Sequence, residues 1–524
     1  MVNLRSKPIF KIKKAVLSII SGMILIFFFF SLAYSSGTKG KIKEILITGN
    51  QHFVSKELHS CMRLKPNSFY TDGLLEKSIE AILRLYEENG FPYCQIDFED
   101  FHYSVNPNDS TNWLSFKLKI TEGPRVKIRK IEFEGNRYTK EKVLKRIIEI
   151  DSSDYFSQKR LEAGLFRLRR VSFIKKIKSA ELVPEPDPCW ADLRIELEEK
   201  RQNSFFGVLG YVPSVHSRKG YFSGKLNFVF DNIFGTGKKA KIAWSKKDPY
   251  SFDLFFSFRE PYLFNLPLCW ELDLRQVDYD SSYSKLDLNT SFNYSPLEKI
   301  SFGFSTGWER VTANERLKNS LPSSRKYKFG MQLCLDLLDY PANPRKGFYY
   351  QTEVIYGRKN YFSTPELEPE KASAYETRIL LDLDNFFPVY KDQIIALSFH
   401  LRKIAGSEKK ISISDQFNLG GLNSLRGYRE EEFSGDKLFW SNLEYRLILS
   451  SESRAYLFWD FGYFSRKIEN HLTHTLQKIS GSKSGFGVGL KLDTSLGVYE
   501  VDYALGEKDR FSEGKIHFGI SNRF

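Results

Sequence analysis

The sequence has few cysteines, and they are not arranged as metal ligands. Five cysteines are spread over 524 residues without a CxxC pair, and the eight histidines form no cluster with metal-ligand spacing. His471 and His474 lie in a polar connection rather than in a helix, so we expect neither a metal site nor a bound cofactor. Cys61 and Cys94 fall within one candidate domain, where an exported protein could form a disulfide, and the sequence leaves that pairing open.

The sequence also lacks repeated long apolar runs. Its mean hydropathy is −0.38, although it contains 45 Phe and 28 Tyr residues. A helical membrane protein needs repeated spans of about 20 apolar residues, so this class is disfavoured. A membrane β-barrel is compatible, because lipid-facing apolar residues alternate with polar lumen residues along each strand and the two kinds average out.

One long apolar run, from Ala15 to Ala33, follows five basic residues at the N-terminus. Together with the small residues that end it, this run predicts a secretory signal peptide over residues 1–36, cleaved near Ser35 or Ser36. Because the run is long, a retained membrane anchor is the alternative. Cleavage would lower the formal charge from +14 to about +9. We interpret this excess as solubilising charge and expect no nucleic-acid partner.

Two short motifs resemble parts of enzyme sites but lack their structural context. Gly303–Gly307 matches the G-x-S-x-G pattern of hydrolases. It lies inside an alternating strand pattern with no helix after it, whereas the serine of that pattern needs a strand-to-helix turn. Gly235–Lys238 lacks the upstream glycine and the following helix of a phosphate-binding loop. We therefore expect no enzymatic activity.

Residues 41–201 contain two copies of one pattern. The run Ile45–Asn50 recurs as Ile131–Asn136, and both copies end in Gly-Asn. Each copy continues with a short and then a longer amphipathic helix, and closes with one or two alternating strands. The sequence therefore predicts two α+β domains, residues 41–123 and 124–201. Their helices are expected at 54–62, 74–89, 140–148 and 158–170, and their closing strands include 114–120 and 193–197.

From about Ser204 the helical periodicity gives way to short runs with period two. Phe252, Leu254, Phe256 and Phe258, for example, fall on one face of a strand. Such alternation means that one face meets an apolar phase, which is a second sheet in a soluble sandwich and lipid in a membrane barrel. Sixteen runs can be marked within residues 204–524, an even number, as a closed single-chain outer-membrane barrel requires. They cover residues 204–213, 221–230, 238–246, 251–259, 268–277, 284–295, 300–310, 327–338, 347–357, 374–385, 393–404, 437–449, 455–464, 484–493, 497–505 and 514–523.

The four longest connections follow the seventh, ninth, eleventh and thirteenth of these strands. All four therefore fall on one rim of the predicted barrel, as the long outward loops of such barrels do. The third of them carries Arg426, Gly427 and Tyr428. Alternation along the next two strands turns Glu444 and Asp460 towards the lumen, beside this connection. The connections lie near 311–326, 358–373, 405–436 and 465–483.

These features resemble the outer-membrane assembly barrels of the BamA and TamA family. The β-α-α-β-β order of the repeats, with the stretches Tyr86–Tyr93 and Glu122–Pro124, resembles the POTRA domain of that family. The second copy has no clear counterpart of the first stretch. Gly420–Tyr428 resembles the family's Arg-Gly-Tyr/Phe loop motif, and Phe458–Gly462 resembles its motif on the thirteenth strand.

The resemblance implies a role for particular residues. The long loop would fold back into the lumen, where Arg426 would pair with Asp460 and where Glu444 is a further candidate partner. Gly427 would allow a tight turn and Tyr428 an aromatic contact. The terminal Phe524 resembles the signal by which barrel precursors are recognised for insertion.

The resemblance also implies a function in outer-membrane protein assembly. POTRA domains in the periplasm would receive unfolded barrel precursors on their sheet edges, with accessory assembly proteins as further partners. A barrel in contact with outer-membrane lipid would template insertion at a weak seam between its first and last strands. The alternative is a two-partner secretion transporter, which also carries two POTRA domains below a sixteen-stranded barrel. A passive outer-membrane channel is a third interpretation.

Overall fold

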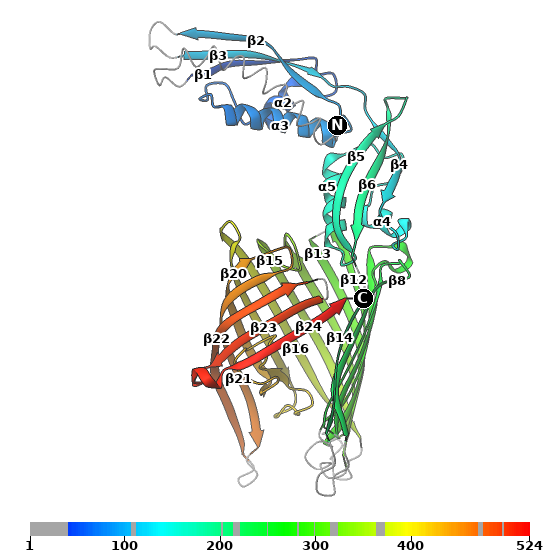
Figure 1. The fold of residues 1–524 in the computed structure, drawn as a ribbon, viewed down its shortest axis with the longest axis vertical. Coiled ribbons are helices and arrows are strands. Elements are labelled where there is room, and N and C mark those ends of the chain that lie inside the picture. The colour runs from blue at the N-terminus through cyan, green and yellow to red at the C-terminus, as the bar shows by residue number, and fades with distance from the viewer. Residues whose placement is uncertain are drawn as a thin grey trace. The chain divides into compact units, whose positions relative to one another are not determined.

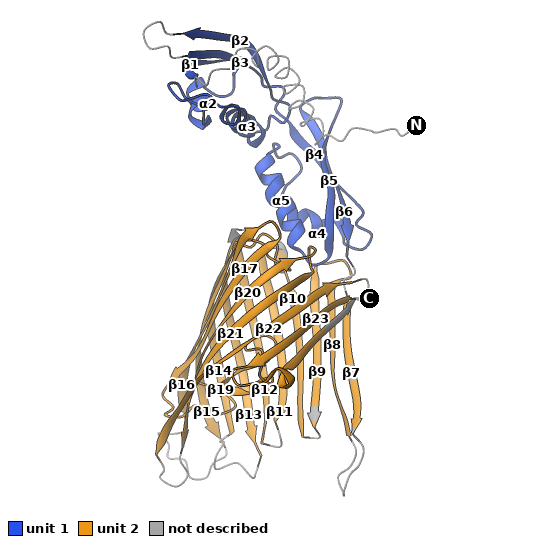
Figure 2. Ribbon diagram, turned by 60° about the vertical axis from the view of Figure 1, so that its left-hand side comes forward, with its two compact units in different colours: residues 1–200 blue, residues 201–524 orange. Residues whose placement is uncertain are grey.

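The computed structural model divides the chain into two compact units, Met1–Lys200 and Arg201–Phe524 (Figure 2). The predicted signal peptide and the terminal Phe524 lie outside the described residues. None of the helices in the described part of the chain has the length and hydropathy needed to cross a membrane. The structure describes residues 40–105, 112–200, 203–212, 221–248, 250–279, 282–297, 299–314, 323–362, 373–469, 475–494 and 497–523.

The first repeat of unit 1 is a three-stranded sheet with two helices on one face (Figure 1). The strand order is β1-β3-β2, with β1 parallel and β2 antiparallel to the central β3. Ile82 and Tyr86 from the longer helix pack with Leu118 from the central strand to form the core. The elements are β1 (Lys41–Thr48), α2 (Ser55–Cys61), α3 (Asp72–Glu88), β2 (Gln95–Val105) and β3 (Asn112–Thr121).

The second repeat has the same arrangement, with strand order β4-β6-β5. Both repeats turn at their Gly-Asn pair, where Gly49 and Gly135 have φ angles of +81° and +91°. A Cβ on either glycine would run into a carbonyl oxygen of the closing strand, that of Ile120 or Leu197. Only glycine fits this turn, which explains why it recurs. The elements are β4 (Lys127–Glu134), α4 (Glu141–Ile148), α5 (Gln158–Arg170), β5 (Ile174–Pro184) and β6 (Trp190–Glu199).

An ion pair joins two strands of the second repeat. Arg129 on β4 donates from Nε and Nη2 to the two carboxylate oxygens of Asp192 on β6, at 2.8 and 2.6 Å. These hydrogen bonds lower the pKa of the Asp192 carboxyl below its usual value. The carboxylate therefore stabilises this repeat at neutral pH.

All five cysteines are free thiols, so Cys61 and Cys94 do not form the disulfide that the sequence left open. Burial, together with the nearby carboxylates of Glu122 and Glu87, raises the pKa of the Cys94 thiol to about 12. A thiol with so high a pKa stays protonated and unreactive at neutral pH.

Unit 2 is a closed antiparallel barrel of sixteen strands, which confirms the predicted fold class. Each of the sixteen alternating runs in the sequence corresponds to one strand. The strands are β7 (Asn203–Val212), β8 (Tyr221–Ile233), β9 (Lys238–Asp248), β10 (Ser251–Glu260), β11 (Leu268–Tyr279), β12 (Tyr283–Leu297), β13 (Ile300–Ala313), β14 (Ser323–Asp336), β15 (Gly347–Phe362), β16 (Ser373–Tyr390), β17 (Gln393–Gly406), β20 (Lys437–Ile448), β21 (Arg454–Glu469), β22 (Leu476–Asp493), β23 (Gly497–Gly506) and β24 (Lys515–Arg523).

Several strands extend beyond the runs at the rim that carries the long loops. β22, for example, begins at Leu476 rather than near residue 484, and its added residues pair with the end of β21. The stretch Leu476–Lys483 lacks clear apolar alternation. Backbone pairing continues there although neither face of the hairpin shows an apolar pattern. Three of the four long connections are therefore shorter than predicted, and residues 315–322, 363–372 and 470–474 within them lie outside the described residues.

Candidate functional site in the barrel lumen

The loop between β17 and β20, residues 407–436, is described throughout and has structure of its own. It contains a short hairpin of β18 (Phe417–Leu419) and β19 (Phe433–Gly435), which the sequence did not predict. Leu419 and Leu425 of the loop are buried against Leu438 and Trp440 of β20. These apolar contacts fold the loop back against the wall of the barrel.

Alternation on the two strands behind the loop separates lipid-facing from lumen-facing residues as predicted. Leu443 and Leu457 are exposed on the outer face, at 39% and 57% of their surface. Glu444, one position after Leu443, and Asp460, three positions after Leu457, are 8% and 0% exposed. The loop therefore covers a pair of lumen carboxylates on β20 and β21.

Arg426 binds both of these carboxylates. Its Nε and Nη2 donate to the two oxygens of Asp460 at 2.8 and 2.7 Å, and its Nη1 donates to Glu444 at 2.8 Å. The backbone N–H of Arg426 also donates to Asp460, at 3.0 Å. Asn442 on β20 donates to Asp460 at 2.8 Å and to the Ser424 carbonyl at 2.8 Å. The motif is thus held by a bidentate pair of the strongest kind.

Two further residues complete the environment of Arg426: Phe458, which the sequence placed in the thirteenth-strand motif without a contact to Arg426, and Asp502, which sequence analysis did not identify. Its guanidinium lies 3.6 Å from the ring centroid of Phe458, a cation–π distance. Its Nη1 lies 3.6 Å from a carboxylate oxygen of Asp502 on β23. Burial alone would lower the pKa of Arg426, but the bonds to Asp460 and the other carboxylates outweigh it and raise that pKa. Alternation along β23 could have pointed to Asp502, because the same parity places it in the lumen.

Gly427 and Tyr428 connect the motif to the last strands of the barrel. Gly427 has a φ of +90°, and a Cβ there would lie 2.7 Å from the carbonyl of Leu505 on β23. Its N–H donates to Nε2 of His517 on β24 at 3.4 Å. The Tyr428 hydroxyl donates to the Ser484 carbonyl at 3.1 Å and accepts from the Glu507 N–H at 3.2 Å. All three motif residues are therefore fixed in the lumen, while their role in the cell stays a prediction.

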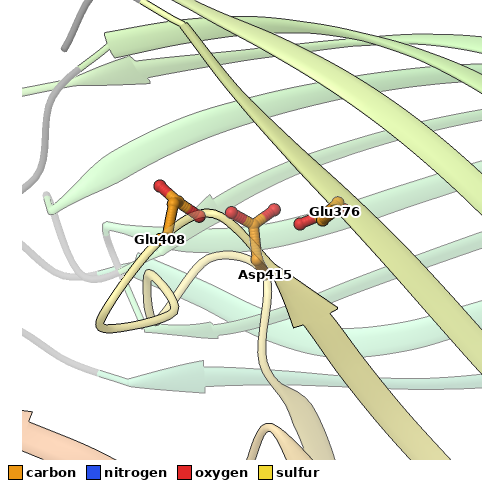
Figure 3. A group of neighbouring side chains, drawn as sticks. All are labelled: Glu376, Glu408 and Asp415. Carbon is orange, nitrogen blue, oxygen red and sulfur yellow. The ribbon is translucent and has the colours of Figure 1, made fainter. Parts of the chain in front are cut away.

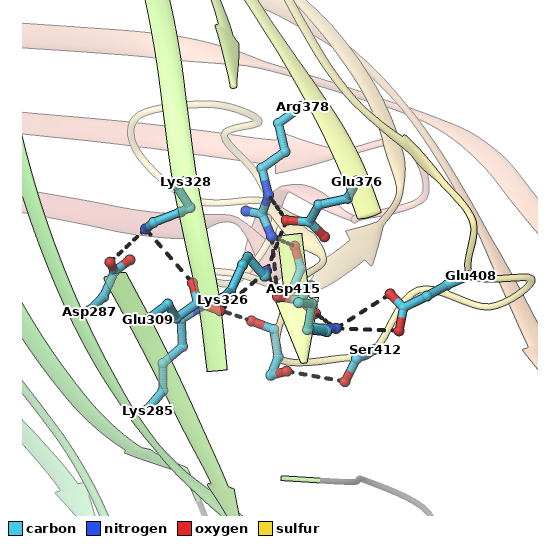
Figure 4. Close-up of polar contacts among 12 residues, drawn as sticks. Lys285, Asp287, Glu309, Lys326, Lys328, Glu376, Arg378, Glu408, Ser412 and Asp415 are labelled. Atoms are coloured by element: carbon cyan, nitrogen blue, oxygen red, sulfur yellow. Dashed lines mark hydrogen bonds and ion pairs between the residues drawn. The ribbon is translucent and has the colours of Figure 1, made fainter. Parts of the chain in front are cut away.

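The first half of the loop enters a second group of charged side chains, which sequence analysis missed (Figure 4). We call it the Asp415 network. Five carboxylates and five cations alternate in it, so their formal charges cancel. No pattern in the sequence indicates it, because its members come from one polar loop and five strands, β12 to β16. They are Lys285, Asp287, Glu309, Lys326, Lys328, Lys359, Glu376, Arg378, Glu408 and Asp415.

Three carboxylates of this network, Glu376, Glu408 and Asp415, converge closely enough to bind a metal ion (Figure 3). Oxygen ligands of this kind suit a hard cation. Lys326 and Lys359, however, already lie among them as ion-pair partners. Because the protein supplies its own cations at this point, we assign no metal to it.

Comparison with known proteins identifies the family of this architecture. Residues 232–524 match the model described as the Omp85 superfamily domain, and this is more than half of the chain. The chain belongs to the Omp85 superfamily. Residues 40–123 and 126–200 match the POTRA model, described as the surface antigen variable number repeat. As an Omp85 protein, it has its barrel in the outer membrane and its POTRA repeats in the periplasm.

Curated relatives of this Omp85 protein are named as assembly factors or envelope proteins. The outer membrane protein assembly factor BamA of Neisseria meningitidis is 22% identical over 427 residues, which cover 76% of this chain and 51% of that protein. BamA of Buchnera aphidicola is 26% identical over 275 residues, 52% of this chain and 41% of that protein. Outer envelope protein 39 of Arabidopsis thaliana is 34% identical over 328 residues, 57% of this chain and 86% of that protein. The chain spans about half the length of the BamA relatives.

Solved structures share the fold. BamA from Haemophilus ducreyi lacking POTRA domains 1–3 aligns with a TM-score of 0.51 at 17% identity, over 92% of this chain and all of that one. CdiB from Escherichia coli aligns with a TM-score of 0.52 at 14% identity, over 94% of this chain and 92% of that one. Both alignments cover more than nine-tenths of this chain, so the likeness extends over its whole fold.

Proposed function

We propose that this Omp85 protein inserts other β-barrel proteins into the outer membrane, without enzymatic chemistry. The names of its BamA relatives support this. The observation that carries the proposal is the closure of the barrel. Among the described residues, β24 and β7 are joined at two residue pairs, Asn522 with Phe205 and Arg523 with Ser204. Every other neighbouring pair of strands in the barrel has at least eight.

The other edges of β7 and β24 are paired with β8 and β23, but a seam with so few pairs leaves most backbone donors and acceptors on the two facing edges available. Unpaired strand edges are templates for the pairing of another chain. A client strand added at this seam would gain backbone hydrogen bonds in a phase that offers no water to replace them. Strand addition at the seam therefore supplies the driving force that insertion of a barrel precursor needs.

The POTRA repeats differ in how well their sheet edges suit a client. β2 is an edge strand of the first sheet, and its outer part exposes Phe101, Tyr103 and Val105. β5 is the corresponding edge of the second sheet, and it carries Lys175 and Lys178. Lysines on an edge oppose strand addition, whereas exposed apolar residues favour it. Unfolded outer-membrane precursors would therefore bind along β2, with little sequence preference.

The test is a disulfide across the seam. In a variant without the native cysteines, Phe205→Cys with Asn522→Cys places two thiols on directly paired residues, within disulfide range. The control, Leu254→Cys with Gln276→Cys, joins β10 and β11, which are paired along their length. We expect the seam disulfide alone to lower the levels of other outer-membrane barrels in cells that depend on the variant, and a reductant to restore them.

Depletion of the protein and conductance measurements test the two alternatives, a two-partner secretion transporter and a passive channel. If other barrels keep normal levels on depletion of the protein while one exported protein is lost, the protein is a two-partner secretion transporter and the assembly proposal is wrong. A steady conductance of the purified protein in lipid bilayers that the seam disulfide does not change would favour a passive channel.

A further inference from the structure

Asp415 is the most completely enclosed charge of the lumen loop. The residue is 1% exposed, and three cations from three adjacent strands surround its carboxylate. Lys359 on β15 donates to it at 2.6 Å, Arg378 on β16 donates at 3.3 Å, and Lys326 on β14 forms an ion pair with it. Burial alone would raise the pKa of Asp415, but these cations outweigh burial and hold the pKa well below its usual value.

The lumen loop also supplies carboxylates that pair with cations of the barrel wall. Both carboxylates that pair with Lys359 belong to the loop, Asp415 and Glu408, and the Lys359 residue is 3% exposed. In the whole Asp415 network the wall contributes five cations and three carboxylates, and the loop contributes the other two carboxylates. Without the two carboxylates of the loop, the wall residues of the network would carry an excess of two positive charges.

The two ends of the segment 415–426 carry opposite charges. Asp415 lies among cations of β14 to β16, whereas Arg426 lies among carboxylates of β20, β21 and β23. A shift of the loop that exchanged these ends would bring like charges together in both places. Opposed charges of this kind select one placement and exclude others.

We propose that Asp415 is a second positioning residue of the lumen loop, which anchors the start of the segment independently of Arg426. The Arg-Gly-Tyr motif then reaches β20 and β21 in one register because the loop is fixed at both ends. This inference concerns the placement of the loop and does not depend on the function proposed above.

The experiment probes each end of the segment separately in the full-length protein. In a variant without the native cysteines, Ser412→Cys reports on the first anchor and Ser424→Cys on the second. Both probes are close in size to the serine they replace. Each is combined with Asp415→Asn, and labelling by a membrane-impermeant maleimide is followed in lipid vesicles. The matched control is Asp287→Asn, which removes a carboxylate of the same network that belongs to β12 and not to the loop.

We expect Asp415→Asn to raise the labelling rate of the Ser412→Cys probe by at least about tenfold, because removing one partner of a buried ion pair costs more than the energy of a tenfold change. The Ser424→Cys probe should change by less than about twofold, since Arg426 still holds that end. Unchanged labelling of the first probe, or an equal rise with Asp287→Asn, would overturn the proposal.

Asp415→Asn removes one carboxylate partner from each of three buried cations, which keep other carboxylate partners. If this loss prevents folding, heat-dependent gel mobility of the barrel reveals it. In that case Asp415→Asn is combined with Lys359→Gln, so that an anion and a cation are removed together. This double variant should fold and still expose the Ser412→Cys probe. If it folds and the probe stays protected, Asp415 does not anchor the loop.

Discussion

Replacing Asp460 by Asn should destabilise the barrel more than any other single loss of charge at the motif. Asp460 accepts four hydrogen bonds, from Arg426 Nε, Nη2 and backbone N and from Asn442. Asparagine keeps the shape but turns one acceptor into a donor and leaves Arg426 with an unpaired N–H. Hydrogen bonds to charged groups contribute about 1.5–3 kcal/mol each. Loss of a partner from a buried pair costs about 3–5 kcal/mol, and we expect a loss in that range.

The barrel contains a matched control for this measurement. Arg275 donates from Nε and Nη2 to the two oxygens of Asp253 at 3.0 and 2.6 Å, so that pair is also bidentate. Its side chains are 52% and 32% exposed, however, whereas those of Arg426 and Asp460 are 5% and 0% exposed. Because water screens an exposed pair, Asp253→Asn should cost less than about 1 kcal/mol.

Guanidinium unfolding of the full-length protein in detergent micelles, followed by tryptophan fluorescence, gives both free energies of unfolding. An equal loss in the two variants would refute the claim that burial of the motif makes its ion pair strong. A charge exchange of Arg426 and Asp460 is a poorer test. An aspartate at position 426 would face Glu444 and Asp502, so stability need not return even though the contact is real.

Two further predictions concern the site and the second repeat. Gly485→Ala should destabilise the barrel in the same unfolding assay, because its Cβ would run into the carbonyl oxygen of Arg426, whereas Gly519→Ala, with no atom closer than 3.6 Å, should be tolerated. In unit 1, the lowered pKa of Asp192 means that its contribution to stability is present above about pH 4 and is lost as the pH falls through that lowered pKa. Asp192→Asn should therefore weaken the acid dependence of backbone hydrogen exchange in residues 126–200.

The sequence was sufficient to predict the strands of the barrel because the outer face of every strand contacts lipid. Each strand must present apolar residues outward, so period-two alternation marked all sixteen strands and turned Glu444 and Asp460 inward. Alternation did not mark the parts of strands at the rim, such as the start of β22, where the outer face is not required to be apolar. It also missed the hairpin inside the loop. Gly49 and Gly135 of unit 1 could also be recognised in the sequence, because both repeats need a residue without a Cβ at the same turn.

The Asp415 network could not be found in this way. Its members lie on five consecutive strands and are joined by the entry of the loop, and Lys326 and Asp415 are 89 residues apart. Alternation indicates whether a side chain faces the lipid or the lumen, but it does not indicate which side chain it contacts. The choice between an ion pair and a solvated charge depends on burial, and burial in the lumen depends on where the loop lies.

The lumen loop connects an extensively paired part of the barrel wall to the seam. Asp415 is fixed on β14 to β16, where neighbouring strands are paired at 14 residue pairs each, while Gly427 reaches His517 on β24, beside the seam. Tyr428 also holds the turn before β24 through the Glu507 N–H. Among the described residues, β24 has eight registered pairs with β23 but two with β7, so contacts from the loop add to the few that hold its seam side. Loss of the contacts made by the Arg-Gly-Tyr motif should therefore speed backbone hydrogen exchange first in β24, at the seam. Exchange in the paired strands β14 to β16 should stay slow.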